Sequence, residues 1–191
     1  MGTLMESWPR RHRITVNEYH RMAEVGLLAP DARVELIEGE IIDMAPIGKE
    51  HTSVVDQLTR LLVRAVGDDA IVRVQGSIRL SQISEPEPDV VLLKPKPDFY
   101  RSEYASGADT LLVIEVSDTT LRYDRDVKVP LYARHGVSEV WIVDLQNDRL
   151  LVYGSLGDGA YARQESVARP ETMLVAGLPG VALELTSVFA P

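Results

Sequence analysis

Two stretches of the chain carry apolar residues at helical spacing. Between residues 49 and 66, valine, leucine and alanine side chains return every three or four positions, which predicts an amphipathic helix. Residues 15–25 predict a shorter helix, because Thr15 followed three positions later by Glu18 is the pattern of a capping box. Both segments therefore have a face that must pack against other parts of the chain.

A third helix is expected over residues 121–135, but a proline interrupts it. Proline is harmless only in the first turn of a helix, because it lacks the N–H group that later turns require. Pro130 therefore predicts either that this helix begins near Asp126 or that it is kinked.

Extended segments separate these helices. Apolar and β-branched residues predict strands at residues 33–44, 71–75, 77–80, 89–93, 110–116 and 138–145. The first of these is typical of a hairpin that turns at Glu38 and Gly39, and a bend at Gly76 joins the next two into one extended region. Residues 149–188 predict a meander added to the main sheet. The segments 89–93 and 110–116 are the most apolar, so we expect them at the sheet centre, covered by helices.

Composition narrows the class of protein. The chain has 191 residues, 45% of them hydrophobic and 26% charged, which is ordinary for one globular domain. We expect that domain at residues 14–191, after a flexible basic leader at residues 1–13. The absence of cysteine excludes disulfide scaffolds and thiolate metal sites, and fits the reducing cytoplasm, which is the expected location.

The charge balance adds a second constraint. With 20 Lys and Arg against 29 Asp and Glu, the net charge is −9, which argues against a protein that coats nucleic acid by bulk charge. This negative charge does not exclude an enzyme that binds phosphates through metal ions. No apolar run is long enough to span a membrane, so no membrane association is expected.

Two acids stand at the edges of the apolar strands. Asp89 opens the strand at residues 89–93, and Glu115 interrupts the apolar run at residues 110–116. A buried carboxylate is costly unless it is paired or binds a cation. Such oxygen ligands suit magnesium or manganese. The alternative is structural, with Asp89 capping its strand and Glu115 paired with an arginine.

A cluster of polar residues follows in the predicted third helix. Asp124, Lys128 and Tyr132 are spaced four apart and share one helix face. Lys128 could reach the site of the two acids and stabilise negative charge on a phosphate. The alternative is a solvated Asp–Lys pair, which contributes only a few tenths of a kcal/mol.

Further candidates lie nearer the N-terminus. The predicted hairpin carries Glu35, Glu38 and Glu40, any of which could complete a metal site, and its turn leaves open which one does. His51, at the start of the predicted helix at residues 49–66, could face a phosphate or support a ligand. The alternative is that all four are solvated surface residues.

The order of these motifs resembles a known family. Glu35-Leu-Ile-Glu-Gly-Glu40, His51, Pro88-Asp89-Val90, Glu115-Val-Ser117, Tyr123-Asp-Arg-Asp-Val-Lys128 and Gly136-Val-Ser-Glu-Val-Trp-Ile-Val-Asp144 occur in sequence. This pattern is similar to the Uma-two family, formerly a domain of unknown function, within the PD-(D/E)XK restriction-endonuclease-like superfamily. The resemblance implies an α/β fold with an α-β-β-β-α-β core. Its mixed central sheet would be flanked by helices and carry additional β-hairpins at both ends.

The resemblance also implies roles for individual residues. Asp89 and Glu115 would bind Mg²⁺ or Mn²⁺ together with the backbone carbonyl of Val116. Ser117 stands where the superfamily usually has its lysine, and Lys128 would supply that charge from the following helix. Glu35 would be an additional acid of the catalytic set. Supporting or substrate-binding roles would fall to His51, Tyr132 and Asp124.

The implied activity is metal-dependent hydrolysis of phosphodiester bonds in DNA. A homodimer would fit, since cutting a duplex requires two strand cuts. Because the acids repel DNA, we expect DNA binding to need the metal. Two alternatives remain open. The chain could keep the fold as a binding module without catalysis, or hydrolyse a smaller phosphate substrate.

Overall fold

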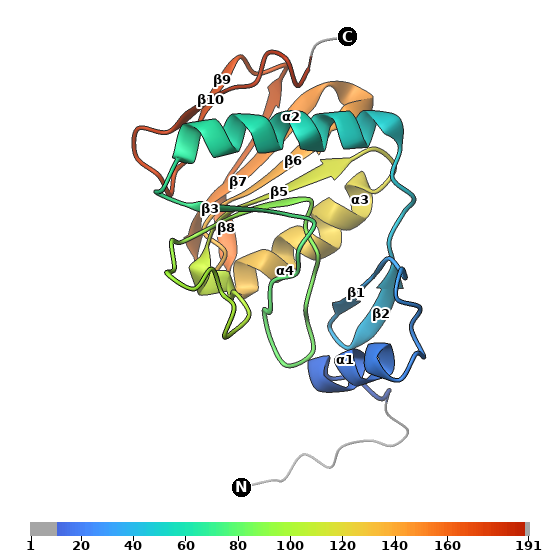
Figure 1. The fold of residues 1–191 in the computed structure, drawn as a ribbon. Helices are drawn as coiled ribbons and strands as arrows, with labels where there is room; N and C mark the ends of the chain where they lie inside the picture. Colours follow the sequence, from blue (N-terminus) through green and yellow to red (C-terminus); the bar gives the residue numbers. More distant parts are fainter. Residues whose placement is uncertain (1–10, 190–191) are drawn as a thin grey trace, which may run out of the picture.

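A six-stranded mixed sheet forms the centre of the molecule, as a computed structural model describing residues 11–189 shows (Figure 1). Its strands are β3 (Ile71–Val74), β4 (Val90–Leu93), β5 (Thr110–Ser117), β6 (Val140–Asp144), β7 (Arg149–Gly157) and β8 (Ala160–Ala168). They lie in sequence order, and β5 and β6 are the one parallel pair of this sheet. A parallel pair needs a crossover connection, and the helical segment between β5 and β6 supplies it. The predicted α/β fold class and core order are confirmed.

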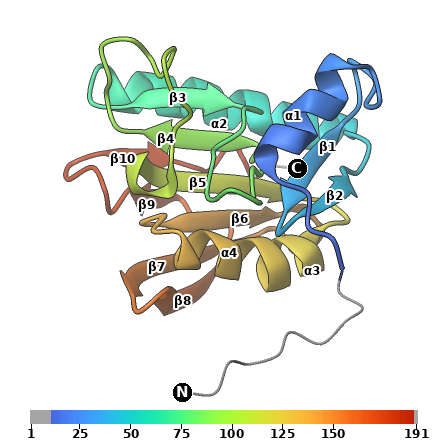
Figure 2. The same cartoon turned by 90° about the horizontal axis from the view of Figure 1, so that it is seen from below.

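Helices cover both faces of this sheet (Figures 1 and 2). The helical elements are α1 (Val16–Glu24), α2 (Lys49–Val66), α3 (Leu121–Tyr123), the π turn η2 (Asp124–Lys128) and α4 (Val129–Arg134), with 3₁₀ turns η1 (Gly107–Asp109) and η3 (Leu145–Asn147). Successive strand residues point to opposite faces. Leu92 and Ile114 therefore pack with α2, whereas Val91 and Val113 pack with α4. This alternation decides which strand side chains can meet α4.

The helical segment around Pro130 occupies the expected range and contains a π turn. It begins at Leu121 rather than near Asp126, and the π turn lies just before the proline. In that turn the N–H of Val129 donates to the carbonyl of Asp124, five residues back. Pro130 has no N–H group and cannot donate to the carbonyl four residues back. The five-residue hydrogen bond just before it shifts the backbone pairing at this point, so the helical segment continues into α4.

A hairpin and α1 lie at one end of the sheet (Figure 1). β1 (Val34–Ile37) and β2 (Glu40–Asp43) pair as predicted. Gly39 adopts φ +83° at their turn, and an added Cβ there would meet the Cβ of Arg13 at 2.5 Å. Residues 1–10 of the expected leader lie outside the described part of the chain. The end of that leader packs on the hairpin.

Two sequence expectations about strands are wrong. Residues 77–80 are not part of a strand, because Gln75 has φ 45° and turns the chain away after β3. The C-terminal meander joins the main sheet only through β7 and β8. β9 (Thr172–Leu174) and β10 (Ala182–Glu184) form a separate two-stranded sheet, since Val175 and Leu183 pack into the core on the α2 side.

Candidate active site

The two strand acids stand side by side. β4 and β5 are antiparallel with Val90 opposite Ile114, so Asp89, the residue directly before β4, lies opposite Glu115 one step beyond the last ladder pair. Opposed residues of an antiparallel pair have Cβ atoms about 5 Å apart and point to the same face. That face is the one covered by α4, because Glu115 alternates in step with Val113. The sheet itself therefore brings Asp89 and Glu115 together.

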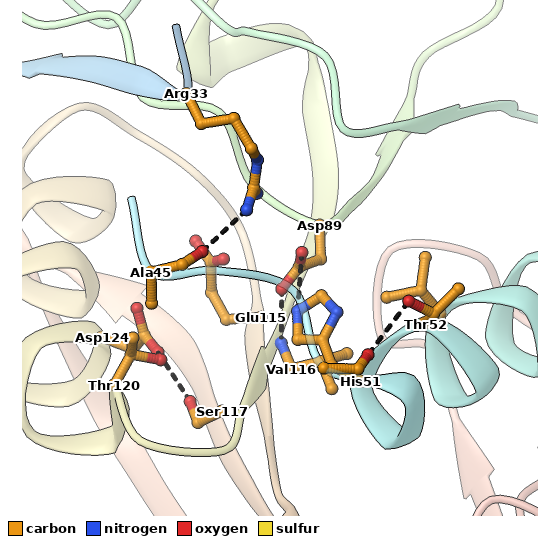
Figure 3. A network of polar contacts seen from close by, with 12 residues as sticks. Arg33, Ala45, His51, Thr52, Asp89, Glu115, Val116, Ser117, Thr120 and Asp124 are labelled. Carbon is orange, nitrogen blue, oxygen red and sulfur yellow. Dashed lines mark hydrogen bonds and ion pairs between the residues drawn. The ribbon is translucent and has the colours of Figure 1, made fainter. Parts of the chain in front are cut away.

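Asp89 is held from two directions (Figure 3). Its Oδ2 accepts a hydrogen bond of 2.8 Å from the backbone N–H of Val116. Its Oδ1 lies 3.1 Å from Nε2 of His51, which extends from the first turn of α2. Residues Val116 and His51 thus fix the orientation of a buried carboxylate from β5 and from α2.

Glu115 receives two groups from the helical segment that covers it. Its Oε1 accepts a 2.6 Å hydrogen bond from the Tyr132 hydroxyl and lies 2.8 Å from Nζ of Lys128. Lys128 also lies 3.2 Å from Oε2 of Glu35, which comes from β1. All four side chains are buried, so β1, β5, η2 and α4 converge on one polar cluster.

Burial controls the protonation of this cluster. Desolvation, together with the negative charges of Asp124, Asp89 and Glu35, raises the pKa of Glu115 to about 8, although Lys128 opposes the shift. Desolvation lowers the pKa of Lys128, but attraction by Glu115 and Glu35 outweighs it and keeps the pKa well above its usual value. Desolvation and the neighbouring carboxylates also raise the pKa of Tyr132, so its hydroxyl remains a donor.

Asp124 belongs to the same region and has its own donors (Figure 3). Its Oδ2 accepts hydrogen bonds from Ser117 Oγ at 2.7 Å and from Thr120 Oγ1 at 2.6 Å. Desolvation raises its pKa, and Lys128 and these two hydroxyl groups oppose the shift. Ser117, two residues after Glu115, thus donates to a carboxylate in this chain.

The structure distinguishes among the three hairpin glutamates. Glu35 is buried, and its Oε2 also accepts a 3.1 Å hydrogen bond from the N–H of Glu87. Glu38 pairs with Arg134 at 2.9 Å and Glu40 with Arg11 at 3.4 Å, and both side chains are exposed. Among these three, Glu35 is therefore the one that reaches Lys128.

A pocket of about 400 Å³ opens beside the cluster. Its polar wall contains six of the acids and bases described above, namely Glu35, His51, Asp89, Glu115, Asp124 and Lys128. Its other wall comes from the hairpin and the segment before α2, including Ile42, Met44 and Ile47. Arg33 lies at this wall, where its Nη1 donates to the carbonyl of Ala45 at 2.7 Å (Figure 3). The volume is in the range of sites that bind small ligands or one unit of a polymer.

Sequence reasoning missed several residues of this pocket. Arg33, Glu87 and Tyr123 line it, but none interrupts an apolar strand or belongs to a spacing pattern that points to a ligand. The sequence position of Glu87 offered one clue. Glu87 lies two residues before Asp89, and residues two apart in an extended segment point to the same side. Desolvation raises the pKa of Glu87, and Glu35 and Asp89 add to the shift.

The donor set fits a hard divalent cation with few protein ligands. Among residues 11–189, no three Asp, Glu or His side chains are grouped closely enough to hold a metal by themselves. Mg²⁺ usually takes one or two carboxylates and keeps several waters. The N–H and C=O of a strand residue point to the same side. Since the N–H of Val116 donates to Asp89, the Val116 carbonyl is expected on the same side of β5, where it could join Asp89 and Glu115 as an oxygen ligand.

Comparison with known proteins agrees with this fold. The crystal structure of a putative nuclease belonging to DUF820, from Anabaena variabilis ATCC 29413 at 1.96 Å resolution, superposes with a TM-score of 0.70 at 16% identity. The match covers 92% of this chain and 97% of that chain, and it shows a shared fold. No curated protein matches the chain. Within the described residues, no helix is long and apolar enough to cross a membrane.

The family comparison reaches further than the fold. The model of the Uma2 family, described as putative restriction endonuclease, matches residues 16–186, which confirms the resemblance found in the sequence motifs. The matched range includes the hairpin, both strand acids and Lys128. This chain therefore belongs to the Uma2 family of putative restriction endonucleases.

Proposed function

We propose that the protein is a divalent-metal-dependent endonuclease that hydrolyses phosphodiester bonds in DNA. The observation that carries this proposal is the charge of the buried cluster. Four buried acids, Glu35, Asp89, Glu115 and Asp124, line one pocket with a single buried ammonium group, that of Lys128. Burial and the neighbouring acids raise the pKa of Glu115 to about 8, because one ammonium group does not offset them all. A bound divalent cation would favour the charged form of these acids.

The residues of the chain have separate roles in this proposal. Asp89 and Glu115, with the Val116 carbonyl, would hold Mg²⁺ or Mn²⁺, and the bound cation would supply a nucleophilic water and neutralise the phosphate. His51 and Tyr132 orient these two carboxylates through the contacts described above. The charge of Lys128 stabilises negative charge that develops on the phosphate.

Metal loading should also control substrate binding. Without a cation, the carboxylates that line the pocket repel the phosphates of DNA. We therefore infer that DNA binds weakly to the metal-free protein at physiological salt. Gel-shift titrations with Ca²⁺ and with EDTA measure this difference, and equal affinity in both would contradict it.

A dimer would explain how both strands of a duplex are cut. Each protomer would contribute one copy of the pocket beside Glu115, so two-fold pairing would present two sites to the two strands. We infer that the active form is a homodimer on DNA. Analytical ultracentrifugation with and without a duplex tests this, and a monomer on cleaved duplex DNA would contradict it.

The test of the proposed activity compares variants on supercoiled plasmid. Wild type should nick or linearise the plasmid with Mg²⁺ or Mn²⁺, whereas Asp89→Ala, purified in the same way, and wild type in EDTA should not. Equal cleavage by wild type and Asp89→Ala would indicate a contaminant. Absence of cleavage by either protein on plasmid and on short single-stranded DNA would contradict the proposal and favour a binding module without catalysis.

A further inference from the structure

Lys128 occupies a position that a second cation would need. We infer that the site takes one divalent cation per chain, at Asp89 and Glu115, because the Lys128 ammonium group permanently fills the second cation position, between Glu35 and Glu115. This inference rests on the proposed function, since it takes the divalent cation at Asp89 and Glu115 from it. It adds the number of metal ions and the residue that sets that number.

The contacts of the two facing oxygens support this inference. Oε1 of Glu115 lies 2.8 Å from the ammonium nitrogen and accepts the Tyr132 hydroxyl at 2.6 Å. Oε2 of Glu35 lies 3.2 Å from the same nitrogen and accepts the Glu87 N–H at 3.1 Å. A carboxylate oxygen has two lone pairs. Both oxygens that face the space between Glu35 and Glu115 therefore already have two donors each.

The ammonium group is also difficult to displace. The Lys128 side chain is only 4% exposed, and the carboxylates on both sides of it are equally buried. A metal ion entering this position would have to move a charged group away from its counter-charges without giving it access to water. Removing one partner of a buried ion pair is strongly unfavourable. A second divalent ion would thus compete against an intramolecular cation that never dissociates.

The same contacts leave the first position free. Because Lys128 and Tyr132 both approach Oε1 of Glu115, its other oxygen, Oε2, remains for a metal ion. No hydrogen bond to Oε2 occurs within the described residues, and Glu115 lines the pocket. Asp89, the residue directly before β4, stands opposite Glu115 and lines the same pocket. Lys128 therefore directs Glu115 to bind through one oxygen and separates the two cation positions.

The experiment counts Mn²⁺ ions rather than measuring cleavage. Isothermal titration calorimetry and the electron paramagnetic resonance of free Mn²⁺ both give the number of ions per chain. Wild type should bind one ion, and Lys128→Met, which removes the charge but keeps a similar length, should bind two. Lys128→Arg keeps the charge and should bind one. Lys94→Met, an exposed lysine-to-methionine change on the loop after β4, is the matched control and should bind one.

A double variant tests whether the added ion uses the predicted position. Lys128→Met combined with Glu35→Gln removes a ligand of the second position, so the count should return to one. Asp89→Asn in the wild-type background removes the first position and should abolish binding. Circular dichroism and thermal melts confirm folding of each variant. Should Lys128→Met fail to fold, the counts for wild type and Lys128→Arg still test the inference.

The outcomes separate this inference from the proposed function. No Mn²⁺ bound to wild type would contradict the metal dependence on which both rest. Two ions bound to wild type or to Lys128→Arg would overturn the inference and leave the proposed metal-dependent activity intact. One ion bound to a folded Lys128→Met protein would also overturn it, because the vacated position would then attract no cation.

Discussion

One buried glutamate near the end of β5 and another just before β6 have contrasting surroundings. Glu115, near the end of β5, shares its space with Lys128 and further carboxylates and borders a pocket. Glu139, just before β6 and so at the other end of the sheet, accepts hydrogen bonds from Trp141 Nε1 at 3.0 Å and from the N–H of Ala176 at 2.9 Å. Both side chains are almost fully buried.

The difference lies in what compensates each charge. Glu139 is stabilised by two neutral donors and does not line the pocket beside Glu115, so its hydrogen bonds tie the segment before β10 to the sheet. Glu115 has a counter-charge, but also several like charges that raise its pKa. A buried carboxylate is therefore not a sign of chemistry by itself. Several of them around one cavity, with raised pKa values, are typical of a functional site.

The largest effect expected from this comparison is on activity. Glu115→Gln removes a proposed metal ligand and should reduce DNA cleavage by roughly 100-fold or more, since even residues that only support metal ligands contribute about 10–100-fold. Glu139→Gln is the matched change at the other buried glutamate and should keep cleavage within about twofold. Plasmid nicking rates with Mn²⁺ measure both. An equal loss of cleavage in the two variants would contradict the functional distinction between Glu115 and Glu139.

The next effect concerns stability. Lys128→Met leaves Glu35 and Glu115 buried without their counter-charge, and breaking a buried pair in this way costs about 3–5 kcal/mol. Arg163, whose charge lowers the pKa of Glu139, forms a partly exposed pair with Glu165. Arg163→Met should therefore cost less than about 1 kcal/mol. Urea unfolding of both variants without metal tests this order. Similar unfolding midpoints for Lys128→Met and Arg163→Met would contradict it.

Local patterns in the sequence predicted most of the helices and strands and singled out the two acids beside the apolar strands. Period-two and helical spacings depend on backbone geometry alone, and an acid inside an apolar strand is visible without any contact. Asp89 and Glu115 were found in this way. The same criterion would also have selected Glu139, which precedes the apolar run of β6. Only the tertiary partners of Glu139 and Glu115 show that their surroundings differ.

Other features depended on contacts between distant segments. Glu35, Glu38 and Glu40 are alike in sequence, and the choice of Glu35 follows from the segment ending at Glu87, which approaches β1 in the folded chain. The π turn before Pro130 is a backbone adjustment that spacing rules do not contain. Tertiary packing determines both features, so local sequence patterns alone could not predict them.

A smaller effect is expected from hydrogen bonds to tyrosine. Tyr132→Phe removes the donor to the Glu115 carboxylate, and bonds to charged groups contribute about 1.5–3 kcal/mol. Tyr161 is also buried, but its hydroxyl donates to the neutral carbonyl of Val137 at 2.8 Å, so Tyr161→Phe should cost about 0.5–1.5 kcal/mol. Thermal or urea unfolding gives both values. A larger loss for Tyr161→Phe than for Tyr132→Phe would contradict this order.

The smallest effect is a pH dependence at Glu139. Desolvation raises the pKa of Glu139, and the hydrogen bonds from Trp141 and Ala176 oppose the shift. Because the folded state then holds its proton more tightly than the unfolded state, the free energy of unfolding falls as pH rises from the ordinary glutamate pKa through the raised one. The slope for one proton cannot exceed about 1.4 kcal/mol per pH unit.

Glu139→Gln cannot ionise and should lack this contribution. Glutamine has one acceptor oxygen for two donors, so the variant should be less stable than wild type near pH 4, where Glu139 is protonated. The deficit should shrink as pH rises toward 7, because wild type alone then carries the buried charge. Urea unfolding at several pH values in EDTA measures the difference between the two proteins. A deficit that grows with pH would show that the ionised Glu139 is stabilised by its donors more than burial destabilises it.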